Sequence, residues 1–553
     1  MSDSRGATPS RLPWWQHGVV YQVYPRSFRD ASGDGVGDLA GTLSKLDYVS
    51  DTLGVAAVWL SPFYPSPMAD FGYDVSDYCN IDPLFGDLAT FDALVAAAHQ
   101  RGIRVIVDYV PNHTSDQHPW FQSARSSKNS PYRDWYVWRD PKPDGSPPNN
   151  WLAVFGGSVW EWDDATGQYY LHSYLKEQPD LDWRNPAVEA AMFDVLRFWL
   201  DRGVDGFRLD AVRRIMKDPE LRDNPPNPAS RSETHKPRGE YDSQLHFNDI
   251  AHPDIHPAFQ RIRHLLETYE RADGRPRIAI GETHELDWSA LCRYYGENLD
   301  ELHLPFNFGM LSVAWNARAV RALVDGYEAA LPPGAWPNYV LGNHDEPRVA
   351  SRLGSPAQAR LAMLLLLTLR GTPTLYYGDE LGMQDVPIPP EREQDPYGKN
   401  VPGLGLGRDP CRTPMPWEGT ANAGFCPPDA TPWLPLGDDV GEVNVEAQLA
   451  DPRSMLSLTR RLLALRRASR ALSAGRYRPL DDADVPDDCF VYLREADSER
   501  VLVALNFADG ERMVRLPDGE CEVLASTHLD REAPVEGRSL PLRAAEGCVI
   551  RLR

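Results

Sequence analysis

The feature that most constrains this chain is a repeat of short apolar segments and longer amphipathic segments. Eight short segments have the composition of strands: 18–24, 55–60, 103–110, 204–210, 278–283, 301–307, 338–345 and 372–380. Strands that are apolar on both faces and alternate with helices form a parallel sheet that the helices cover. Eight such strands predict a (β/α)₈ barrel rather than an open sheet.

Local signals place the helices between these strands. Thr90 is expected to cap a helix over 91–101, because Thr is a favoured N-terminal capping residue. Asn185 followed by Pro186 predicts the start of another helix, and Gly203 marks its end. Helices of this length between strands fit the barrel repeat.

Two segments interrupt the repeat and a third follows it. Residues 111–178 are rich in Trp, Pro, Gly and Asn and too long for a loop, so we expect an inserted small domain after the third strand. A second Pro- and Gly-rich excursion, about 383–435, follows the eighth strand. The segment 474–553 contains short, evenly spaced β-rich stretches, which predict a C-terminal antiparallel β-sandwich. The barrel is assigned to 1–110 and 179–473.

Composition narrows the classes of function. Lys plus Arg number 57 and Asp plus Glu number 80, and the formal charge of −23 argues against binding nucleic acid. No apolar run approaches the roughly 18 residues of a membrane span, and residues 1–17 lack the apolar segment of a secretory signal. The seven cysteines are an odd number without a CxxC pair, which favours reduced thiols in a cytoplasmic protein. The sequence does not indicate an oligomeric state.

Polar side chains gather where the predicted strands end. They are Asp108, Asn112, His113, Arg208, Asp210, Glu282, His344 and Asp345. The C-terminal ends of barrel strands meet at one rim, where barrel enzymes carry their sites. Arg208 and Asp210 are two residues apart and share a strand face, so the cation can hold the carboxylate ionised. Such pairs also cap barrels for structural reasons, but several carboxylates, an arginine and two histidines together favour a functional site.

The residue types at this rim favour glycoside chemistry. One carboxylate can attack the anomeric carbon while a second protonates the leaving oxygen. Motifs of other enzyme classes are missing: no HExxH occurs, no GxGxxG opens a helix, and GGSVW at 156–160 lacks the last glycine of GxSxG. Zinc protease, dinucleotide-binding and serine hydrolase functions therefore have little support.

Four motifs resemble the signature regions of the α-amylase family of glycoside hydrolases, in order and in spacing. They are DYVPNH (108–113), GFRLDAV (206–212), IGET (280–283) and NHD (343–345). Three further segments resemble the α-glucosidase and oligo-1,6-glucosidase branch of that family: GYDVSDY (72–78), QPDLDW (178–183) and RTPMPW (412–417). The resemblance spans about 14–470 and implies a retaining exo-α-glucosidase that acts by double displacement.

The resemblance also implies the catalytic roles. Asp210 would be the nucleophile, Glu282 the general acid and base, and Asp345 the carboxylate that stabilises the transition state. Glu285, three residues beyond Glu282, remains an alternative acid. No organic cofactor is implied, and the expected partners are small α-glucosides.

Contacts to the substrate follow from the same resemblance. The side chains expected around the terminal glucose are Asp70, Tyr73, Asp108, His113, Phe155, Arg208, His344 and Arg412. Tyr73 would stack on the sugar, and the two histidines would hold its hydroxyls. Asp70 and Arg412 would close the pocket at the non-reducing end, as in exo-acting members, with a surface ion pair as the alternative. Phe155 comes from the aromatic-rich insert and is placed at the rim.

A loop after the first strand resembles a cation site. Its sequence, DASGDGVGD (30–38), resembles the start of an EF-hand loop, but the twelfth position is Gly41 rather than Glu. The α-amylase branch has a similar loop that binds Ca²⁺ or Mg²⁺. The resemblance implies a structural ion held by Asp30, Ser32, Asp34, Asp38 and the carbonyl of Val36. Ser stands at 32 where the family usually has Asn, and a solvated turn is the alternative.

The leading function is hydrolysis of terminal glucose from short α-glucosides, with α-1,4 linkages preferred. Members of the branch that prefer α-1,6 linkages usually carry Val after the nucleophile, whereas Ala211 leaves the acceptor side of the pocket open. One alternative is a glucosyl transferase or isomerase on the same scaffold, forming trehalose, sucrose or other glucosides. Another, a non-catalytic amylase-like transporter subunit, is disfavoured because all three acids are present and no membrane anchor is visible.

Overall fold

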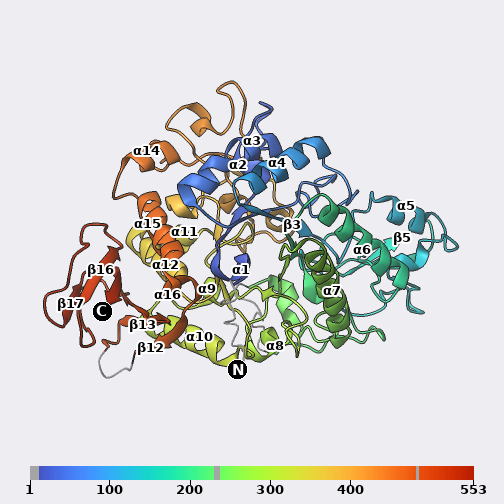
Figure 1. Ribbon diagram of the computed structural model, residues 1–553. Coiled ribbons are helices and arrows are strands. Elements are labelled where there is room, and N and C mark those ends of the chain that lie inside the picture. Colours follow the sequence, from blue (N-terminus) through green and yellow to red (C-terminus); the bar gives the residue numbers. More distant parts are fainter. Residues whose placement is uncertain (1–11, 229–236, 481–484) are drawn as a thin grey trace, which may run out of the picture.

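The computed structural model describes residues 12–228, 237–480 and 485–553. The expectation for residues 1–17 therefore lies partly outside the described residues. Figure 1 shows a central barrel of strands ringed by helices, with the segment that carries α5 and β5 on one side and the C-terminal strands on the other. The predicted fold class, a barrel with an insertion and a C-terminal β-sandwich, is confirmed.

The barrel sheet consists, among the described residues, of eight parallel strands in the order β10-β11-β1-β2-β3-β7-β8-β9. Their bounds are β1 Val20–Val23, β2 Ala57–Leu60, β3 Arg104–Tyr109, β7 Gly206–Leu209, β8 Ile278–Gly281, β9 Leu304–Pro305, β10 Asn338–Val340 and β11 Thr372–Tyr376. Each lies within one predicted segment and is shorter than predicted. The amide of Asn338 closes the sheet: it donates to the carbonyl of Pro305 and accepts from the backbone N–H of Asn307.

Helices connect the strands, and several begin at a residue whose side chain caps the N-terminus. The α-helices are α1 Trp14–His17, α2 Pro25–Phe28, α3 Leu39–Ser44, α4 Leu88–Gln100, α5 Pro119–Ser126, α6 Pro186–Asp201, α7 His256–Asp273, α8 Trp288–Arg293, α9 Gly309–Ser312, α10 Ala317–Ala330, α11 Val349–Leu353, α12 Pro356–Thr368, α13 Pro396–Asn400, α14 Val445–Ala450, α15 Met455–Ala468 and α16 Arg470–Ala474. Asn185 caps α6 as predicted, accepting from the N–H of Ala187. The predicted cap of α4 is wrong: the carboxylate of Asp87 accepts from the N–H of Thr90, so the stronger capping residue starts the helix three residues earlier.

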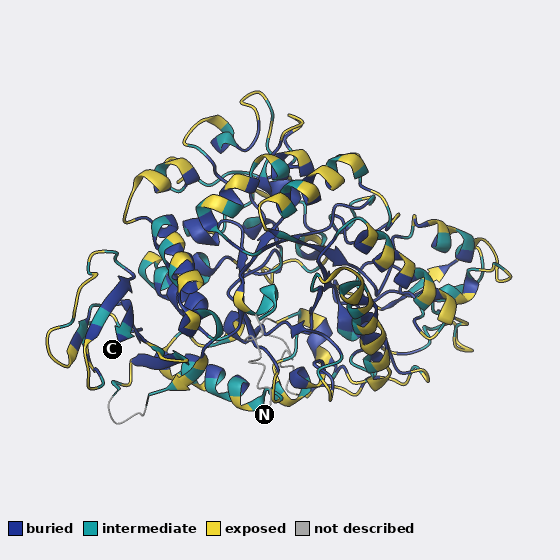
Figure 2. Cartoon of the chain, in the orientation of Figure 1, coloured by how far each residue is buried: buried dark blue, intermediate teal, exposed yellow. Residues whose placement is uncertain are grey.

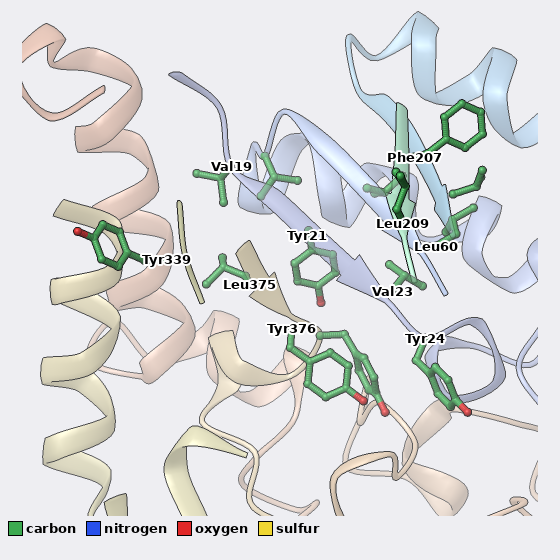
Figure 3. Packing of buried hydrophobic residues seen from close by; sticks show 14 of the residues in the cluster. Val19, Tyr21, Val23, Tyr24, Leu60, Phe207, Leu209, Tyr339, Leu375 and Tyr376 are labelled. Carbon is green, nitrogen blue, oxygen red and sulfur yellow. The ribbon is translucent and has the colours of Figure 1, made fainter. Parts of the chain in front are cut away.

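Apolar side chains pack on both faces of the barrel sheet. Phe207 and Leu209 belong to the outer layer against the helices, part of which Figure 3 shows, whereas Trp59 belongs to the layer inside the barrel. Figure 2 shows buried strands and helices that are exposed only on their outer faces. Successive strand residues alternate between faces, so Arg208 and, just beyond the strand, Asp210 point into the barrel.

The segment between β3 and α6 forms a small antiparallel sheet in the order β4-β6-β5. Its strands are β4 Trp138–Arg139, β5 Trp160–Asp163 and β6 Gln168–Leu171. An apolar cluster joins this segment to the loop after β7 and to the segment after β11. Its buried members are Val154, Phe155, Leu175, Tyr241, Tyr397 and Leu406. Three loops from distant parts of the sequence therefore meet in one cluster.

The C-terminal part consists of two antiparallel sheets. The strands are β12 Arg476–Pro479, β13 Cys489–Ala496, β14 Glu499–Asn506, β15 Arg512–Arg515, β16 Cys521–Ser526, β17 Ser539–Leu542 and β18 Gly547–Leu552. The larger sheet has the order β12-β13-β14-β18-β16, and β15 pairs with β17. Both sheets contribute to one apolar core, which includes Val491, Leu502 and Leu540.

Two further observations concern the described residues as a whole. No helix in residues 12–228, 237–480 or 485–553 has both the length and the apolar character that a membrane crossing requires. All seven cysteines are free thiols, and six of them are buried. Burial of these thiols limits their access to solvent.

Candidate active site

The acids predicted from the sequence come from different strands and meet at one rim. Asp108 lies in β3, whereas Asp210 and Glu282 directly follow β7 and β8. Asp345 lies in the loop after β10. The three carboxylates Asp210, Glu282 and Asp345 line one pocket. The parallel strands therefore bring residues that are far apart in the sequence to one pocket.

A buried guanidinium holds three of the carboxylates. Nη1 of Arg208 lies 2.9 Å from Oδ1 of Asp108 and 2.7 Å from Oδ1 of Asp210, and Nη2 lies 2.9 Å from Oε2 of Glu282. The ring of Trp59 lies 5.2 Å from the guanidinium carbon. The indole N–H of Trp59 also donates to Asp108. One cation in a dry site thus faces three acids, which sets up competition for protons among them.

That competition divides the protons unevenly. Burial, reinforced by the charge of Glu282, raises the pKa of Asp210 well above its usual range despite Arg208. Burial also raises the pKa of Asp108 to about 6. Burial acts in the same direction on Glu282, but Arg208 and His284 outweigh it and lower its pKa. Glu282 accepts from the N–H of Ala211, pairs with Arg208 and lies 2.6 Å from Nε2 of His284, so its ionised form is favoured in the free pocket.

Asp345 is held ionised by two further arginines. Its Oδ1 lies 3.1 Å from Nη1 of Arg408 and 2.9 Å from Nη2 of Arg412, and its Oδ2 lies 3.3 Å from Nε2 of His344. Burial would raise the pKa of Asp345, but these neighbours lower it well below the usual range. A fixed negative charge therefore faces Asp210 and Glu282 across the pocket.

Tyr73 and His113 line the pocket, and His344 packs against Tyr73. Burial lowers the pKa of His113 to about 4 and of His344 to about 3, so both rings are neutral at pH 7. The rings of Tyr73 and His344 are parallel, with centroids 5.4 Å apart, and the Tyr73 hydroxyl lies 2.6 Å from Nε2 of His344. Because Gln22 donates to Nδ1 of His344, the neutral ring carries its proton on Nε2. These groups offer hydrogen bonds to hydroxyls without adding charge.

The structure pairs Asp70 with a different arginine from the one the sequence suggested. Nη2 of Arg408 lies 2.6 Å from Oδ1 of Asp70 and 2.6 Å from Oδ1 of Asp395. Arg412 is fully buried; it donates to the carbonyl of His344 and to Asp345, and it does not line the pocket. The surface ion pair considered as the alternative is also wrong, because Asp70 is buried. Arg408 is thus a pocket residue that sequence reasoning missed.

The remaining pocket wall comes from the three loops of the apolar cluster. Phe155 lines the pocket, and the Arg408 guanidinium lies 5.1 Å from its ring centroid. The loop after β7 adds Ala211, Arg214 and Tyr241, of which the sequence analysis named only Ala211. Arg214 and Tyr241 lie in a stretch without strand or helix periodicity, so no signal in the sequence pointed to them.

The alternative acid lies outside this arrangement. Glu285 pairs with Nη2 of Arg213 at 3.3 Å and accepts from the backbone N–H of Asp287. It is not among the residues that line the pocket. Glu282, which shares Arg208 with Asp210, is therefore the carboxyl in position to act as acid.

The predicted cation loop is closed by its own backbone. Asp30 accepts from the N–H groups of Gly33 and Gly35, and Asp38 accepts from those of Ala31, Ser32 and Gly41. The donor types suit a hard cation, since the loop supplies oxygen atoms throughout. No group of three or more His, Cys, Asp or Glu side chains in the described part of the chain is close enough to hold a metal. The ion at Asp30, Ser32, Asp34, Val36 and Asp38 remains a prediction.

Fold and site together define a class of enzyme. Two pocket carboxyl groups on one guanidinium and a third carboxylate opposite, at the C-terminal rim of a (β/α)₈ barrel, match the paired acids that glycoside hydrolases use. The family model described as alpha amylase, catalytic domain, matches residues 22–475. The chain therefore belongs to the α-amylase family of glycoside hydrolases.

Relatives of known name cover nearly the whole chain. The chain is 42% identical over 522 residues to a probable alpha-glucosidase of Rhizobium meliloti (strain 1021), with 92% of each chain covered. It is 36% identical to an oligo-1,6-glucosidase of Parageobacillus thermoglucosidasius, covering 98% of this chain and 99% of the relative. A crystal structure of the alpha-glucosyl transfer enzyme XgtA superposes with a TM-score of 0.91 at 41% identity, covering 98% of this chain and 100% of that one.

Proposed function

We propose that the protein is a retaining exo-α-glucosidase that releases terminal glucose from short α-glucosides. The observation that carries this proposal is the placement of Asp210 and Glu282 on the two terminal nitrogens of one guanidinium. Two carboxyl groups held this way are close neighbours, as the separation of about 5–5.5 Å in retaining enzymes requires. The buried pair of Asp70 and Arg408 in the pocket wall supports recognition of a chain end.

The reaction would proceed in two displacements. A carboxylate oxygen of Asp210 attacks the anomeric carbon while Glu282 gives its proton to the leaving oxygen, and the C–O bond breaks toward that oxygen. A glycosyl ester on Asp210 results. Glu282 then takes a proton from water, whose oxygen bonds to the anomeric carbon and releases Asp210. The net configuration at that carbon is retained.

Substrate entry must redistribute one proton. In the free pocket the donors around Glu282 favour its ionised form, and burial favours a protonated Asp210. Attack needs the reverse arrangement. The two carboxyl groups share Arg208, so one proton passing between them prepares the nucleophile and the acid together.

The preferred linkage is proposed from the residue after the nucleophile. Ala211 lines the pocket beside Glu282 and leaves space for the second sugar of an α-1,4-glucoside. A difference of methylene size in a pocket changes specificity by about 10–200-fold. We therefore propose maltose and malto-oligosaccharides as better substrates than isomaltose.

A second candidate is transfer of glucose to a sugar hydroxyl instead of water. It uses the same glycosyl ester on Asp210, and a glucosyl transfer enzyme is among the structures that superpose on this chain. The two functions differ only in which hydroxyl reaches the ester. A panel of maltose, maltotriose, isomaltose, sucrose and trehalose, assayed for free glucose and for new glucosides, separates them.

Stereochemistry and the nucleophile variant test the mechanism itself. NMR of the first glucose released should show the α anomer, and Asp210→Asn should lose activity by several orders of magnitude because no other group forms the ester. Release of β-glucose would reject double displacement. If Asp210→Asn loses glucose release but melts like the wild type, the result supports Asp210 as the nucleophile.

We also propose a reducing, cytoplasmic location and a structural Ca²⁺ or Mg²⁺ ion. The seven free thiols support the first proposal. The oxygen-rich loop from Asp30 to Asp38 supports the second. Neither bears on the chemistry of the pocket, because the loop contributes no residue to its lining.

A further inference from the structure

A histidine that plays no part in the proposed reaction touches the acid directly. Nε2 of His284 lies 2.6 Å from Oε1 of Glu282, and His284 lines the pocket. Its side chain is 23% exposed, compared with 9% for Glu282. His284 is therefore the more exposed member of this pair.

The backbone holds this histidine in an unfavourable conformation. The φ angle of His284 is +40°, in the left-handed region that non-glycine residues seldom adopt. Arg213 fixes it there, because its Nη1 donates to the His284 carbonyl and its Nη2 pairs with Glu285. The imidazole packs on the ring of Phe308, with centroids 4.6 Å apart. Strain that neighbours maintain beside a reacting group points to a functional constraint.

The two oxygens of Glu282 have different surroundings. Oε2 pairs with Nη2 of Arg208 at 2.9 Å and accepts from the backbone N–H of Ala211. A proton on Oε2 would point at these donors, so the acidic proton belongs on Oε1, the oxygen that faces His284. Carboxyl and imidazole then share that proton, either as carboxylate with imidazolium or as carboxylic acid with imidazole.

We propose that His284 is the positioning residue of the general acid: it fixes the carboxyl plane of Glu282 and sets how tightly Oε1 holds the catalytic proton. This inference rests on the proposed role of Glu282. Over one turnover Glu282 gives a proton to the leaving oxygen and regains one from water, so His284 ends the cycle in its starting state.

The charges around this pair come from several elements. Arg208 in β7 faces Oε2, and Asp210, Asp108 and Asp345 add negative charge from their strand ends. Arg213 lies behind the histidine backbone. These groups remain when His284 is replaced. Removing the histidine donor therefore raises the pKa of Glu282, and the acid stays protonated to higher pH.

The test compares His284→Ala with wild type on maltose and on an aryl α-glucoside with a good leaving group. We expect kcat/KM for maltose to fall about 10–100-fold, part of the 10²–10⁴-fold that acid–base catalysis contributes. The aryl glucoside needs little acid help, so its loss should be several-fold smaller. The alkaline limb of the kcat/KM profile should move up by about one pH unit. His284→Gln, which can still donate to Oε1, should recover part of kcat.

A matched control comes from a second histidine–glutamate pair. Nδ1 of His256 lies 2.8 Å from Oε2 of Glu301, with exposed fractions of 28% and 4%, and neither residue lines the pocket. His256→Ala should leave the pH profile unchanged. An unmoved alkaline limb in His284→Ala, or equal losses on both substrates, would overturn the inference about His284. Absence of glucose release by wild type, or full activity of Glu282→Gln, would instead reject the proposed function.

Discussion

At the scale of single residues, two arginines divide the carboxylates of the pocket between them. Arg208 forms ion pairs with Asp210 and Glu282, whereas Arg408 forms ion pairs with Asp70 and Asp345. A planar guanidinium can contact two carboxylates in fixed directions, which the compact ammonium of lysine cannot. Arg208 therefore orients the two carboxyl groups proposed to react, and Arg408 orients carboxylates of the pocket wall.

Replacing Arg408 by lysine should weaken substrate binding. The charge remains, but the fork that contacts Asp70, Asp345 and Asp395 is lost, and a buried group left without its partner costs about 1–3 kcal/mol. We expect KM for maltose to rise about 10–100-fold, with a smaller change in kcat. Arg412→Lys is the comparison, because Arg412 supports Asp345 from behind and should lower kcat more than it raises KM. If both variants changed KM and kcat in the same proportion, the different roles assigned to Arg408 and Arg412 would be wrong.

Acidic loss of activity should begin near pH 6, well above the ordinary aspartate pKa of about 3.9. Burial raises the pKa of Asp108 to about 6 and that of Asp210 well above its usual range. As pH drops through about 6, Asp108 takes up a proton in addition to the one that Asp210 and Glu282 share, Arg208 loses an ionised partner, and kcat/KM should fall. Asp108→Asn removes a negative charge beside Asp210 and should move the acidic limb to lower pH. A wild-type limb near pH 4, or a limb that stays in place in the variant, would contradict the argument.

Sequence alone located the acids but not every side chain that binds them. Asp210 and Glu282 were predictable because residues at the ends of parallel strands share a rim. Arg408 was not, because GRDPCR offers two arginines four positions apart. The 3₁₀ turn Asp409–Cys411 turns Arg408 toward the pocket and Arg412 into the core. His284 was missed because its role depends on contact with Glu282.

At the scale of elements, the turn after β7 contacts Glu282 directly, and we expect it to determine the linkage preference. Ala211 adopts φ +47° and its N–H donates to Glu282. Ala211→Val should move the ratio of kcat/KM for maltose to that for isomaltose by about 10–200-fold toward isomaltose. A β-branched residue is strained in this conformation, so both absolute rates should also fall. The quantity to measure is the ratio of kcat/KM for maltose to that for isomaltose. Strain that acts through Glu282 lowers both rates and therefore cancels in this ratio.

Ala211→Gly is the control for this substitution. Glycine adopts the left-handed conformation without strain and leaves the pocket open. We expect the maltose-to-isomaltose ratio to stay near the wild-type value. A wild-type enzyme that cleaves isomaltose faster than maltose would show that another element, such as the segment after β11, determines the linkage.

The loop from Asp30 to Asp38 allows a direct test of the predicted ion. If Ca²⁺ or Mg²⁺ binds there, chelation should lower the melting temperature, since an ion at one hundred times its dissociation constant stabilises by about 2.7 kcal/mol. Asp34→Asn should reduce that shift, because it removes one charged ligand of the ion. The loop itself should stay folded, because the Asp34 side chain is exposed and the hydrogen bond that it accepts within the described loop comes from the nearby N–H of Val36. An unchanged melting temperature with chelator, and no ion by elemental analysis, would leave a turn closed by its own amides.

The strands of the barrel were predictable because both faces are buried and each strand is an apolar run. The strands were predicted to be longer than they are, because polar residues such as Asp345 lie in turns beyond the paired residues. The loop after β7 gave no signal, because it follows neither the strand nor the helix period. Its pocket residues are positioned by packing of Tyr241 with Phe155 and Tyr397, which are distant in sequence.

At the scale of the whole molecule, the C-terminal sandwich is attached to the barrel through the end of α12. Arg494 of β13 donates to the carbonyl of Thr368, the last residue of α12. Arg466 of α15 donates to the carbonyls of Leu367 and Leu369 at 2.9 and 3.0 Å. Two buried cations thus satisfy the carbonyls at the negative end of this helix dipole.

Replacing Arg494 by methionine should therefore destabilise the protein more than a typical surface change. The methionine fills much of the space but leaves the carbonyls of Thr368 and Gly475 without this donor in a buried site. Loss of a buried partner costs about 1–3 kcal/mol, which we expect as a lower free energy of unfolding in denaturant and a lower melting temperature.

Arg500→Met, on the neighbouring strand β14 with a side chain 45% exposed, should change stability by less than about 0.5 kcal/mol. Kinetic constants for maltose should stay unchanged in folded Arg494→Met, because the residue does not line the pocket. Equal stability of the two variants would show that the carbonyls of α12 find other donors and that this contact does not secure the sandwich.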